Sequence, residues 1–277
     1  MKNRKLKISI LLSIILLAIF GVILSVNLTK NSNITNSNVV LEEIEENKGQ
    51  YDEKSIVLNN TTKSKAEALA SKYNAKLRMN SKGDYATLTL PNNSSVKNFF
   101  KSEKNNDDLN NFSLDYYARI SEDYSTSISY PVLAPDYEVS DSNYSYQTYL
   151  NYLNIKNVWN NYQGDGIKVA VIDTGIDTDH SEFLTKISDK SYNATTDKIV
   201  KDYDMSIIED EQGHGTSVAG VIASSFDGSG IVGIAPNVEL VIIKVDCDSK
   251  GQFYRTSDLV FGLYYAIFNS NSKICIL

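Results

Sequence analysis

Two segments dominated by apolar, β-branched residues, Ile167–Ile172 and Glu239–Val245, restrict most strongly what this chain can fold into. Such continuous runs are typical of strands that are buried on both faces, as in parallel sheets. Helical patterns at Ser217–Ala223 and Thr256–Phe268 alternate with them, and Ile274–Leu277 begins another strand. This alternation predicts an α/β fold with a parallel sheet.

Asp173 and His214 are the residues near these strands whose positions indicate chemistry. Asp173 ends the first apolar run, and catalytic groups collect at the carboxyl ends of strands in open α/β sheets. His214 begins a helix between Gly213 and Gly215, which allow the backbone of another segment to approach closely. A carboxylate that fixes the tautomer of an imidazole is the arrangement of a general base. The alternatives are a helix N-cap at Asp173 and a structural histidine.

Residues 51–121 predict a second, smaller unit that precedes the parallel sheet. Its pattern has the order β-α-β-β-α-β of a ferredoxin-like α+β unit. The predicted elements are a strand at Ser55–Leu58, a helix at Thr62–Leu77, a hairpin of Leu77–Met79 with Tyr85–Leu90, a helix at Ser94–Lys104 capped by Ser94 or Ser95, and a strand at Leu114–Ile120.

The N-terminus predicts an export signal. Four basic residues precede an apolar run over residues 8–26, which is long enough to span the hydrocarbon core of a membrane as a helix. Residues 1–30 are therefore interpreted as either a cleaved signal peptide or a signal anchor in the membrane. The polar residues 31–50, rich in Asn, Ser and Glu, predict a linker.

Residues 122–145 contain Pro131 and Pro135 without any apolar period, which predicts an exposed connector that carries a maturation site. The second unit is then expected to begin near Tyr146 with an amphipathic helix that extends to Trp159. Residues 146–277 complete the predicted organisation.

Composition excludes several classes of function. The net charge of −7 argues against nucleic acid as a partner, because phosphate binding needs clustered Lys and Arg. The two cysteines, Cys247 and Cys275, are too few for a disulfide framework, and we expect unpaired thiols. The two histidines, His180 and His214, fit no zinc motif, so the chemistry is expected to need no cofactor.

At these segments the sequence resembles the subtilisin-like serine proteases, or subtilases (peptidase family S8). The matching motifs are Asp173-Thr174-Gly175, the segment His214–Gly220, and Gly233-Ile234-Ala235-Pro236. The resemblance implies that residues 146–277 are the N-terminal half of a peptidase S8 domain. Residues 51–121 similarly resemble the subtilase propeptide, which helps the protease to fold and inhibits it.

The resemblance also implies roles for individual residues. His214 would accept the proton of a nucleophilic serine, and Asp173 would orient the imidazole. Gly251, Gln252 and Phe253 resemble the edge segment that pairs with an extended substrate, and the alternative is an ordinary loop. Three further residues fall where some family members bind calcium, and the alternative there is a set of solvated loop residues: Glu182, Asp227 and Gln147.

The implied function is a secreted or cell-surface serine endopeptidase of a Gram-positive type. It would act on peptide or protein substrates, with its own propeptide as a bound inhibitor. The peptidases that process lantibiotic leader peptides are one group that it resembles. No serine here lies in a context like the family's nucleophile segment, and the oxyanion asparagine is also absent from the sequence. This chain alone is therefore expected to be inactive. Because the strand Ile274–Leu277 would lack its usual neighbour in the sheet, the chain is also expected to be marginally stable or to aggregate. The alternative is a non-catalytic binder or inhibitor, or the remnant of a pseudogene.

Overall fold

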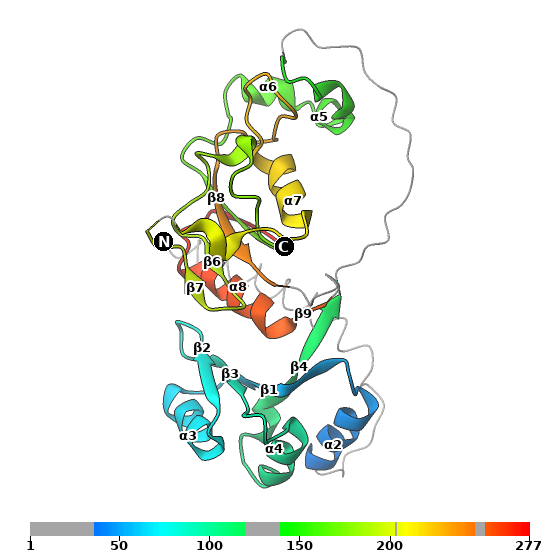
Figure 1. The fold of residues 1–277 in the computed structure, drawn as a ribbon, viewed down its shortest axis with the longest axis vertical. Coiled ribbons are helices and arrows are strands. Elements are labelled where there is room, and N and C mark those ends of the chain that lie inside the picture. The colour runs from blue at the N-terminus through cyan, green and yellow to red at the C-terminus, as the bar shows by residue number, and fades with distance from the viewer. Residues whose placement is uncertain (1–35, 120–138, 203, 247–252) are drawn as a thin grey trace, which may run out of the picture.

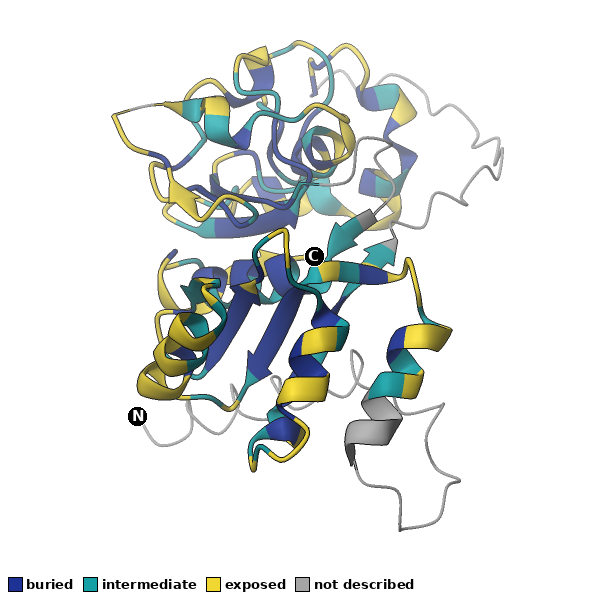
Figure 2. Ribbon diagram, turned by 60° about the horizontal axis from the view of Figure 1, so that its bottom comes forward, coloured by how far each residue is buried: buried dark blue, intermediate teal, exposed yellow. Residues whose placement is uncertain are grey.

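The computed structural model describes residues 36–119, 139–202, 204–246 and 253–277, which form two units (Figure 1). The N-terminal unit comprises residues 36–119, and the α/β unit comprises the described residues from 139 onward. Each unit has its own apolar core. Figure 2 shows that the strands are largely buried, whereas the helices present exposed outer faces.

The N-terminal unit is an antiparallel sheet with helices packed on one face. Its four strands lie in the order β2-β3-β1-β4, and a fifth strand, β9 of the α/β unit, extends it. The order along the chain agrees with the predicted β-α-β-β-α-β pattern. The elements are β1 (Tyr51–Asn59), α3 (Lys63–Tyr73), β2 (Lys76–Met79), β3 (Tyr85–Thr89), α4 (Val96–Ser102), the short 3-10 helix η1 (Leu109–Asn111) and β4 (Phe112–Arg119).

Alternation along β1 gives this sheet two different apolar faces. Ile56 and Leu58 point into the core beneath α3 and α4, where Phe99 packs. Val57 points to the opposite face, where it contacts Phe261 of the α/β unit. Because successive side chains of a strand alternate in direction, one strand serves both the internal core and the contact between the units.

The segment predicted as a linker, residues 31–50, contains a helix instead: α2 (Asn36–Glu46). Leu41 and Ile44 lie three residues apart, so they share one helix face, and Ile44 is buried in the core of the N-terminal unit. The hydroxyl of Tyr51 also donates to the carbonyl of Ile44 over 3.1 Å. The prediction failed because the many Asn, Ser and Glu residues hide this short apolar stripe.

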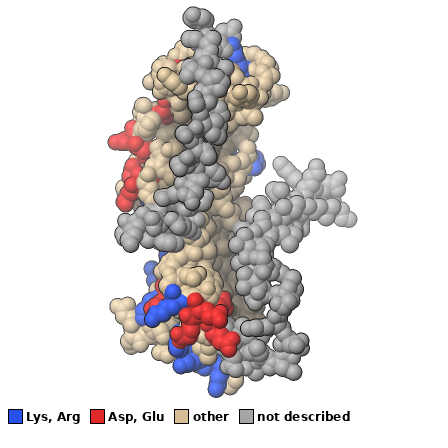
Figure 3. Space-filling model, turned by 90° about the vertical axis from the view of Figure 1, so that its right-hand side faces the viewer, with Lys and Arg blue, Asp and Glu red and all other residues tan. Residues whose placement is uncertain are grey.

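Exposed charges of both signs lie side by side on the N-terminal unit, over the lower part of the face in Figure 3. The pair of Lys97 and Glu45, which joins α4 to α2, is one example, and both side chains are exposed. Such surface pairs contribute about 0–1 kcal/mol, so the apolar core supplies most of the stability of this unit.

The α/β unit is a mainly parallel sheet with the strand order β10-β5-β8-β6-β7, as the sequence predicts. Only the short hairpin of β6 and β7 is antiparallel. Its strands and long helices are β5 (Lys168–Asp173), β6 (Tyr192–Asn193), β7 (Lys198–Ile199), α7 (His214–Ala223), β8 (Glu239–Lys244), β9 (Phe253–Arg255), α8 (Thr256–Phe268) and β10 (Ile274–Ile276). Its 3-10 helices are η2 (Tyr144–Tyr146), η3 (Ser181–Phe183) and η4 (Met205–Ile208).

The two long helices cover opposite faces of this sheet. Ala219 and Ala223 of α7 pack against Val171 on one face. Tyr265 and Ala266 of α8 pack on the other face. The sheet is thus covered on both sides, which explains why β5 and β8 are apolar at almost every position.

The predicted amphipathic helix from Tyr146 to Trp159 is wrong. Two five-residue helices occupy this region, α5 (Thr148–Tyr152) and α6 (Ile155–Trp159). Asn154 separates them with φ of 55°, a left-handed conformation that a continuous helix cannot contain. Residues 139–145 of the predicted connector also belong to this unit, because Val139 and Tyr144 are buried with Trp159.

The predicted export segment lies outside the described residues. Within the described part of the chain, no helix is both long and apolar enough to cross a membrane.

Candidate active site

Asp173 and His214 lie next to each other at the carboxyl edge of the parallel sheet. Asp173 is the last residue of β5, and His214 is the first residue of α7. Nδ1 of the imidazole is 2.8 Å from Oδ1 of the carboxylate. Two residues that are 41 positions apart in the sequence are therefore in direct contact, as the predicted acid–base roles would require.

Close backbone packing between the two segments makes this pairing geometrically accessible. A Cβ atom at Gly215 would lie 2.3 Å from the carbonyl oxygen of Gly175 and 3.2 Å from Cβ of Asp173. Gly175 itself has φ of 121°, which favours glycine strongly. Both glycines are thus needed where α7 meets the turn after β5.

The orientation of the pair suits a general base. The side chain of Asp173 is 12% exposed, whereas that of His214 is 55% exposed. Oδ1 of Asp173 also accepts a hydrogen bond from the backbone N–H of Thr174 over 2.7 Å. No described residue hydrogen-bonds to Nε2 of His214. With Nδ1 donating to the carboxylate, the lone pair on Nε2 is free to accept a proton from an approaching group.

Asp210, which the sequence analysis did not single out, supports the same region. Its carboxylate accepts hydrogen bonds from backbone N–H groups of Gln212, Gly213 and Thr216 and from the hydroxyls of Thr174 and Thr216. Burial would raise the pKa of Asp210, but the hydrogen bonds from Thr216, Gln212 and Gly213 outweigh it and lower the pKa to about 2. A carboxylate in a polar loop has no periodic pattern, so no sequence signal marked it.

We predict that Asp210 makes the folded state more stable above pH 4 than below it. Because its pKa is lowered to about 2 in the folded chain, its contribution is present above the unfolded-state pKa. It is lost as the pH falls through the folded-state pKa. The loss should be about 1–2 kcal/mol, after allowance for partial exposure. Urea unfolding at pH 5, 4 and 3 measures it. Asp210→Asn should flatten this part of the pH profile, whereas Asp204→Asn should leave it unchanged.

The predicted substrate-binding segment is described only at its last residue. Gly251 and Gln252 lie outside the described residues. Phe253 begins β9, whose backbone pairs antiparallel with β4 in the register Phe253 with Arg119 and Arg255 with Tyr117. The predicted pairing of this segment with an added strand is thus present at β9, and the added strand is β4 of the N-terminal unit.

Buried charges connect the two units beside this strand pair. Arg78 of β2 donates to Asp258 of α8 over 2.8 Å and to the hydroxyl of Tyr192 over 2.8 Å. Its guanidinium carbon lies 3.7 Å from the ring centre of Phe261. Burial raises the pKa of Asp258, although the charges of Arg255 and Arg78 oppose that effect. A lone arginine in a predicted hairpin gave no indication of this role.

A second carboxylate of the N-terminal unit reaches the beginning of α8. Asp115 is fully buried in β4. Its Oδ1 accepts from the backbone N–H of Ser257, and its Oδ2 accepts from the hydroxyls of Ser257 and Ser55. Burial raises the pKa of Asp115. The unit therefore supplies an N-terminal cap that α8 lacks in its own sequence, because Arg255 makes no side-chain capping bond.

Two of the three predicted calcium ligands lie together, and the third does not. Glu182 accepts from the backbone N–H of Ser225 over 2.7 Å, in the loop that carries Asp227. Gln147 instead hydrogen-bonds to both backbone groups of Val232. Asp141 lies beside the loop of Asp227, since its Oδ1 accepts from the N–H of Asp227 over 3.3 Å.

This acidic cluster of Asp141, Glu182 and Asp227 is electrostatically unfavourable by itself. Burial raises the pKa of Glu182, and the charges of Asp227 and Asp141 add to this effect, although the hydrogen bond from the Ser225 backbone opposes it. Burial also raises the pKa of Asp141, and the charge of Asp227 adds to the effect. Oδ2 of Asp141 is buried and has no hydrogen-bond partner among the described residues.

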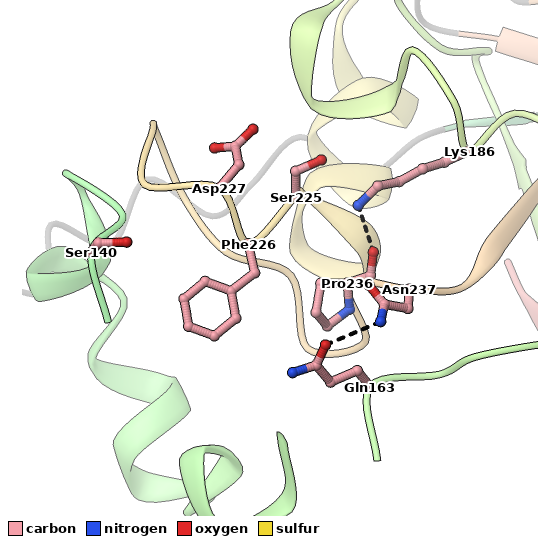
Figure 4. Close-up of a pocket in the computed structure, with 8 residues that line it drawn as sticks. All are labelled: Ser140, Gln163, Lys186, Ser225, Phe226, Asp227, Pro236 and Asn237. Atoms are coloured by element: carbon pink, nitrogen blue, oxygen red, sulfur yellow. Dashed lines mark hydrogen bonds between the residues drawn. The ribbon is translucent and has the colours of Figure 1, made fainter. Parts of the chain in front are cut away.

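An open pocket adjoins the cluster (Figure 4). Lys186 lines it, but its ammonium group donates to the carbonyls of Ala223 and Pro236 rather than to the acids. The lysine therefore completes the end of α7 and does not neutralise the cluster through a direct contact.

Comparison with known proteins shows what most of the α/β unit is similar to. Residues 164–277 match the model of the Subtilase family, Peptidase_S8. The chain is 43% identical over 111 residues to an intracellular serine protease of Paenibacillus polymyxa, a match that covers 40% of this chain and 32% of that protein. It is 39% identical over 107 residues to the major intracellular serine protease of Bacillus subtilis, a match that covers 38% of this chain and 31% of that protein.

Two solved structures share the fold over most of the chain. Fervidolysin from Fervidobacterium pennivorans, a keratinolytic enzyme related to subtilisin, matches 82% of this chain and 36% of its own, with a TM-score of 0.58 and 22% identity. The epidermin leader peptide processing serine protease of Staphylococcus aureus matches 79% of this chain and 48% of its own, with a TM-score of 0.54 and 16% identity.

Residues 164–277 are therefore similar to the subtilase family of serine proteases. The chain spans about a third of the length of the curated relatives that it matches. Because the structural matches cover about four fifths of the chain, they also include parts of the N-terminal unit, for which they show likeness of fold alone.

Proposed function

We propose that Asp173 and His214 are the acid and the base of a serine endopeptidase. The observation that carries the proposal is the Nδ1–Oδ1 contact of 2.8 Å beside an imidazole that is 55% exposed. Asp173 would hold the imidazole in the tautomer that leaves Nε2 able to accept a proton, and it would stabilise the imidazolium formed afterwards.

A nucleophile has to reach Nε2 of His214, and no described serine does so. We therefore propose that the 277-residue chain does not hydrolyse peptides by itself. The test compares this chain with the product of the coding sequence read beyond residue 277, by hydrolysis of casein and by labelling with a fluorophosphonate. The longer product should be active, and His214→Ala should reduce its rate by roughly 10⁴-fold or more. Labelling of the 277-residue chain that disappears in His214→Ala would contradict the proposal.

The N-terminal unit is proposed to be an intramolecular inhibitor of the α/β unit. Its strand β4 pairs with β9, and its face contacts α8 through Arg78 and Asp115. An extended peptide that adds to the same edge would compete with β4. The alternative function, a binder that acts on other proteins through this unit, is disfavoured because the contact face is already covered by α8.

A calcium ion is a second proposal, for the acidic cluster of Asp141, Glu182 and Asp227. The unpartnered buried oxygen of Asp141 and the raised pKa values of Asp141 and Glu182 support a cation there. The described residues contain no group of three acidic, histidine or cysteine side chains close enough to hold a metal by themselves. Backbone carbonyl oxygens would have to complete the coordination, as is usual for calcium.

We expect calcium to raise the melting temperature of the wild-type chain and Asp141→Asn to reduce this increase. At a concentration 100-fold above the dissociation constant, the stabilisation would be about 2.7 kcal/mol. Thermal unfolding in calcium and in a chelator measures the effect, with Asp204→Asn as the exposed control. Equal melting temperatures of the wild type under both conditions would refute the site.

We propose that the chain is exported, because its basic and apolar N-terminal residues resemble an export signal that would leave the α/β unit outside the membrane. Two relatives are named intracellular, and those names describe those proteins. Fractionation of cells that express the chain with and without residues 1–30 tests the proposal. The full chain should leave the cytoplasm and the shortened chain should remain there. The same location for both would exclude it.

A further inference from the structure

Two threonine hydroxyls connect the segment of Asp173 to the segment of His214 in a reciprocal way. The hydroxyl of Thr174, next to Asp173, accepts from the backbone N–H of Gly215 over 2.9 Å. The hydroxyl of Thr216, which follows that glycine, accepts from the backbone N–H of Asp177 over 2.9 Å. Each segment thus presents a hydroxyl to a backbone donor of the other.

Both hydroxyls donate their single hydrogen to the same carboxylate. Oδ1 of Asp210 accepts from Thr174 over 2.9 Å, and Oδ2 accepts from Thr216 over 2.6 Å. A hydroxyl group has one hydrogen and two lone pairs. When the carboxylate accepts that hydrogen, the lone pairs remain to accept from the N–H groups of the opposite segment. Asp210 thereby fixes the direction of both connections.

The same carboxylate also fixes the backbone that leads into α7. Oδ1 accepts from Gln212 and Gly213, at 3.0 and 2.9 Å, and Oδ2 accepts from the N–H of Thr216 at 2.9 Å. His214 lies between these donors. Its position relative to Asp173 is therefore determined on both sides by one group that touches neither the imidazole nor the Asp173 carboxylate.

We propose that Asp210 is a positioning residue that holds His214 against Asp173, acting through Thr174 and Thr216. It does not contact the reacting atoms. A role of Asp210 in catalysis rests on the proposed function, but the effect of Asp210 on the tautomer of His214 can be measured in this chain without peptidase activity.

Variants of Asp210 are expected to fold, because other bonds join the same segments. The N–H of Ile176 donates to the carbonyl of Ile208, and the N–H of Asp210 donates to the carbonyl of Ile176. The ammonium of Lys244 also bridges the carbonyls of Thr174 and Glu209. These bonds do not involve the carboxylate of Asp210.

The test is ¹⁵N NMR of the imidazole nitrogens in the full chain, at about pH 9, where a histidine side chain is mainly neutral. In the wild type, His214 should be mainly in the tautomer with the proton on Nδ1. Asp210→Asn should shift it toward the mixture found for a free imidazole. Thr216→Val should produce a smaller shift in the same direction, and Thr216→Ser should restore the wild-type spectrum. Asp204 is an acid that caps a nearby turn, so Asp204→Asn should leave the ring nitrogen signals of His214 unchanged.

A structural role alone would lower the melting temperature without changing the tautomer. The proposal is therefore overturned when Asp210→Asn and Thr216→Val are folded and both keep the wild-type ring nitrogen signals. If Asp210→Asn does not fold, the comparison of Thr216→Val with Thr216→Ser decides the result. Failure of the proposed function would appear as an inactive longer product in which His214 nevertheless keeps its Nδ1–H tautomer.

Discussion

Arg78→Ala is expected to weaken the contact between the two units by about 3 kcal/mol, because removing one partner of a buried ion pair leaves the other charge without compensation. Asp258 is 2% exposed and would lose its partner at Oδ1. The variant also removes the stacking on Phe261 and the bond to Tyr192. Arg255 still binds Oδ2 of Asp258, so the loss should lie at the lower end of the usual range.

Hydrogen exchange of the amides in β9 and α8 measures this loss, as a fall in protection of roughly 100-fold. Arg78→Lys should be intermediate, because lysine keeps the charge but not the planar fork. Lys65→Ala is the matched control, since Lys65 pairs with Asp108 over 2.7 Å on the surface of the same unit. In the Lys65→Ala variant, the free energy of opening that protects these amides should change by less than about 1 kcal/mol. Unchanged protection in a folded Arg78→Ala protein would exclude Arg78 as a major contact.

Gly215→Ala is expected to destabilise the α/β unit by about 3 kcal/mol, because overpacking against atoms that cannot move is costly. The new methyl group would meet the backbone oxygen and nitrogen of Gly175 at 2.3 and 3.0 Å. To relieve this contact, α7 has to move away from β5, and His214 moves with it. The variant should therefore also lose the contact between His214 and Asp173.

Gly220→Ala provides the matched control, because it lies in the same helix with room for a methyl group. The nearest atom to its added Cβ, Oγ of Ser224, lies 3.4 Å away. Alanine is a better helix former than glycine by roughly 0.5–1 kcal/mol, so this variant should be neutral or more stable. Urea unfolding of both variants gives the comparison. A Gly215→Ala protein as stable as Gly220→Ala would refute the packing argument.

Periodic and local patterns explain which parts of the fold could be predicted from the sequence. β5 and β8 are apolar on both faces, and α8 begins and ends at the predicted residues, Thr256 and Phe268. Asp173 and His214 were recognisable because each follows a local rule, a strand end and a pair of glycines. These features are encoded by residues close together in the chain.

The missed features depend on residues that are distant or without a pattern. Arg78 and Asp258 are 180 positions apart, and neither local context indicates a partner. Asp141 lies beside the loop of Asp227 because the chain after residue 139 packs there, a contact that spacing alone does not reveal. Asp210 lies in a polar loop, where only the three-dimensional arrangement shows its five donors.

The pairing of β4 with β9 also affects how tightly any other strand can bind that edge. A competing peptide meets an edge whose occupant is tethered in the same molecule, so the occupant's effective concentration does not fall on dilution. The apparent affinity of the peptide is its intrinsic affinity multiplied by the fraction of molecules in which β4 has left. If leaving costs about 4 kcal/mol, that fraction is roughly one in a thousand. Severing the chain between residues 119 and 139 would convert this constant competition into one that depends on protein concentration.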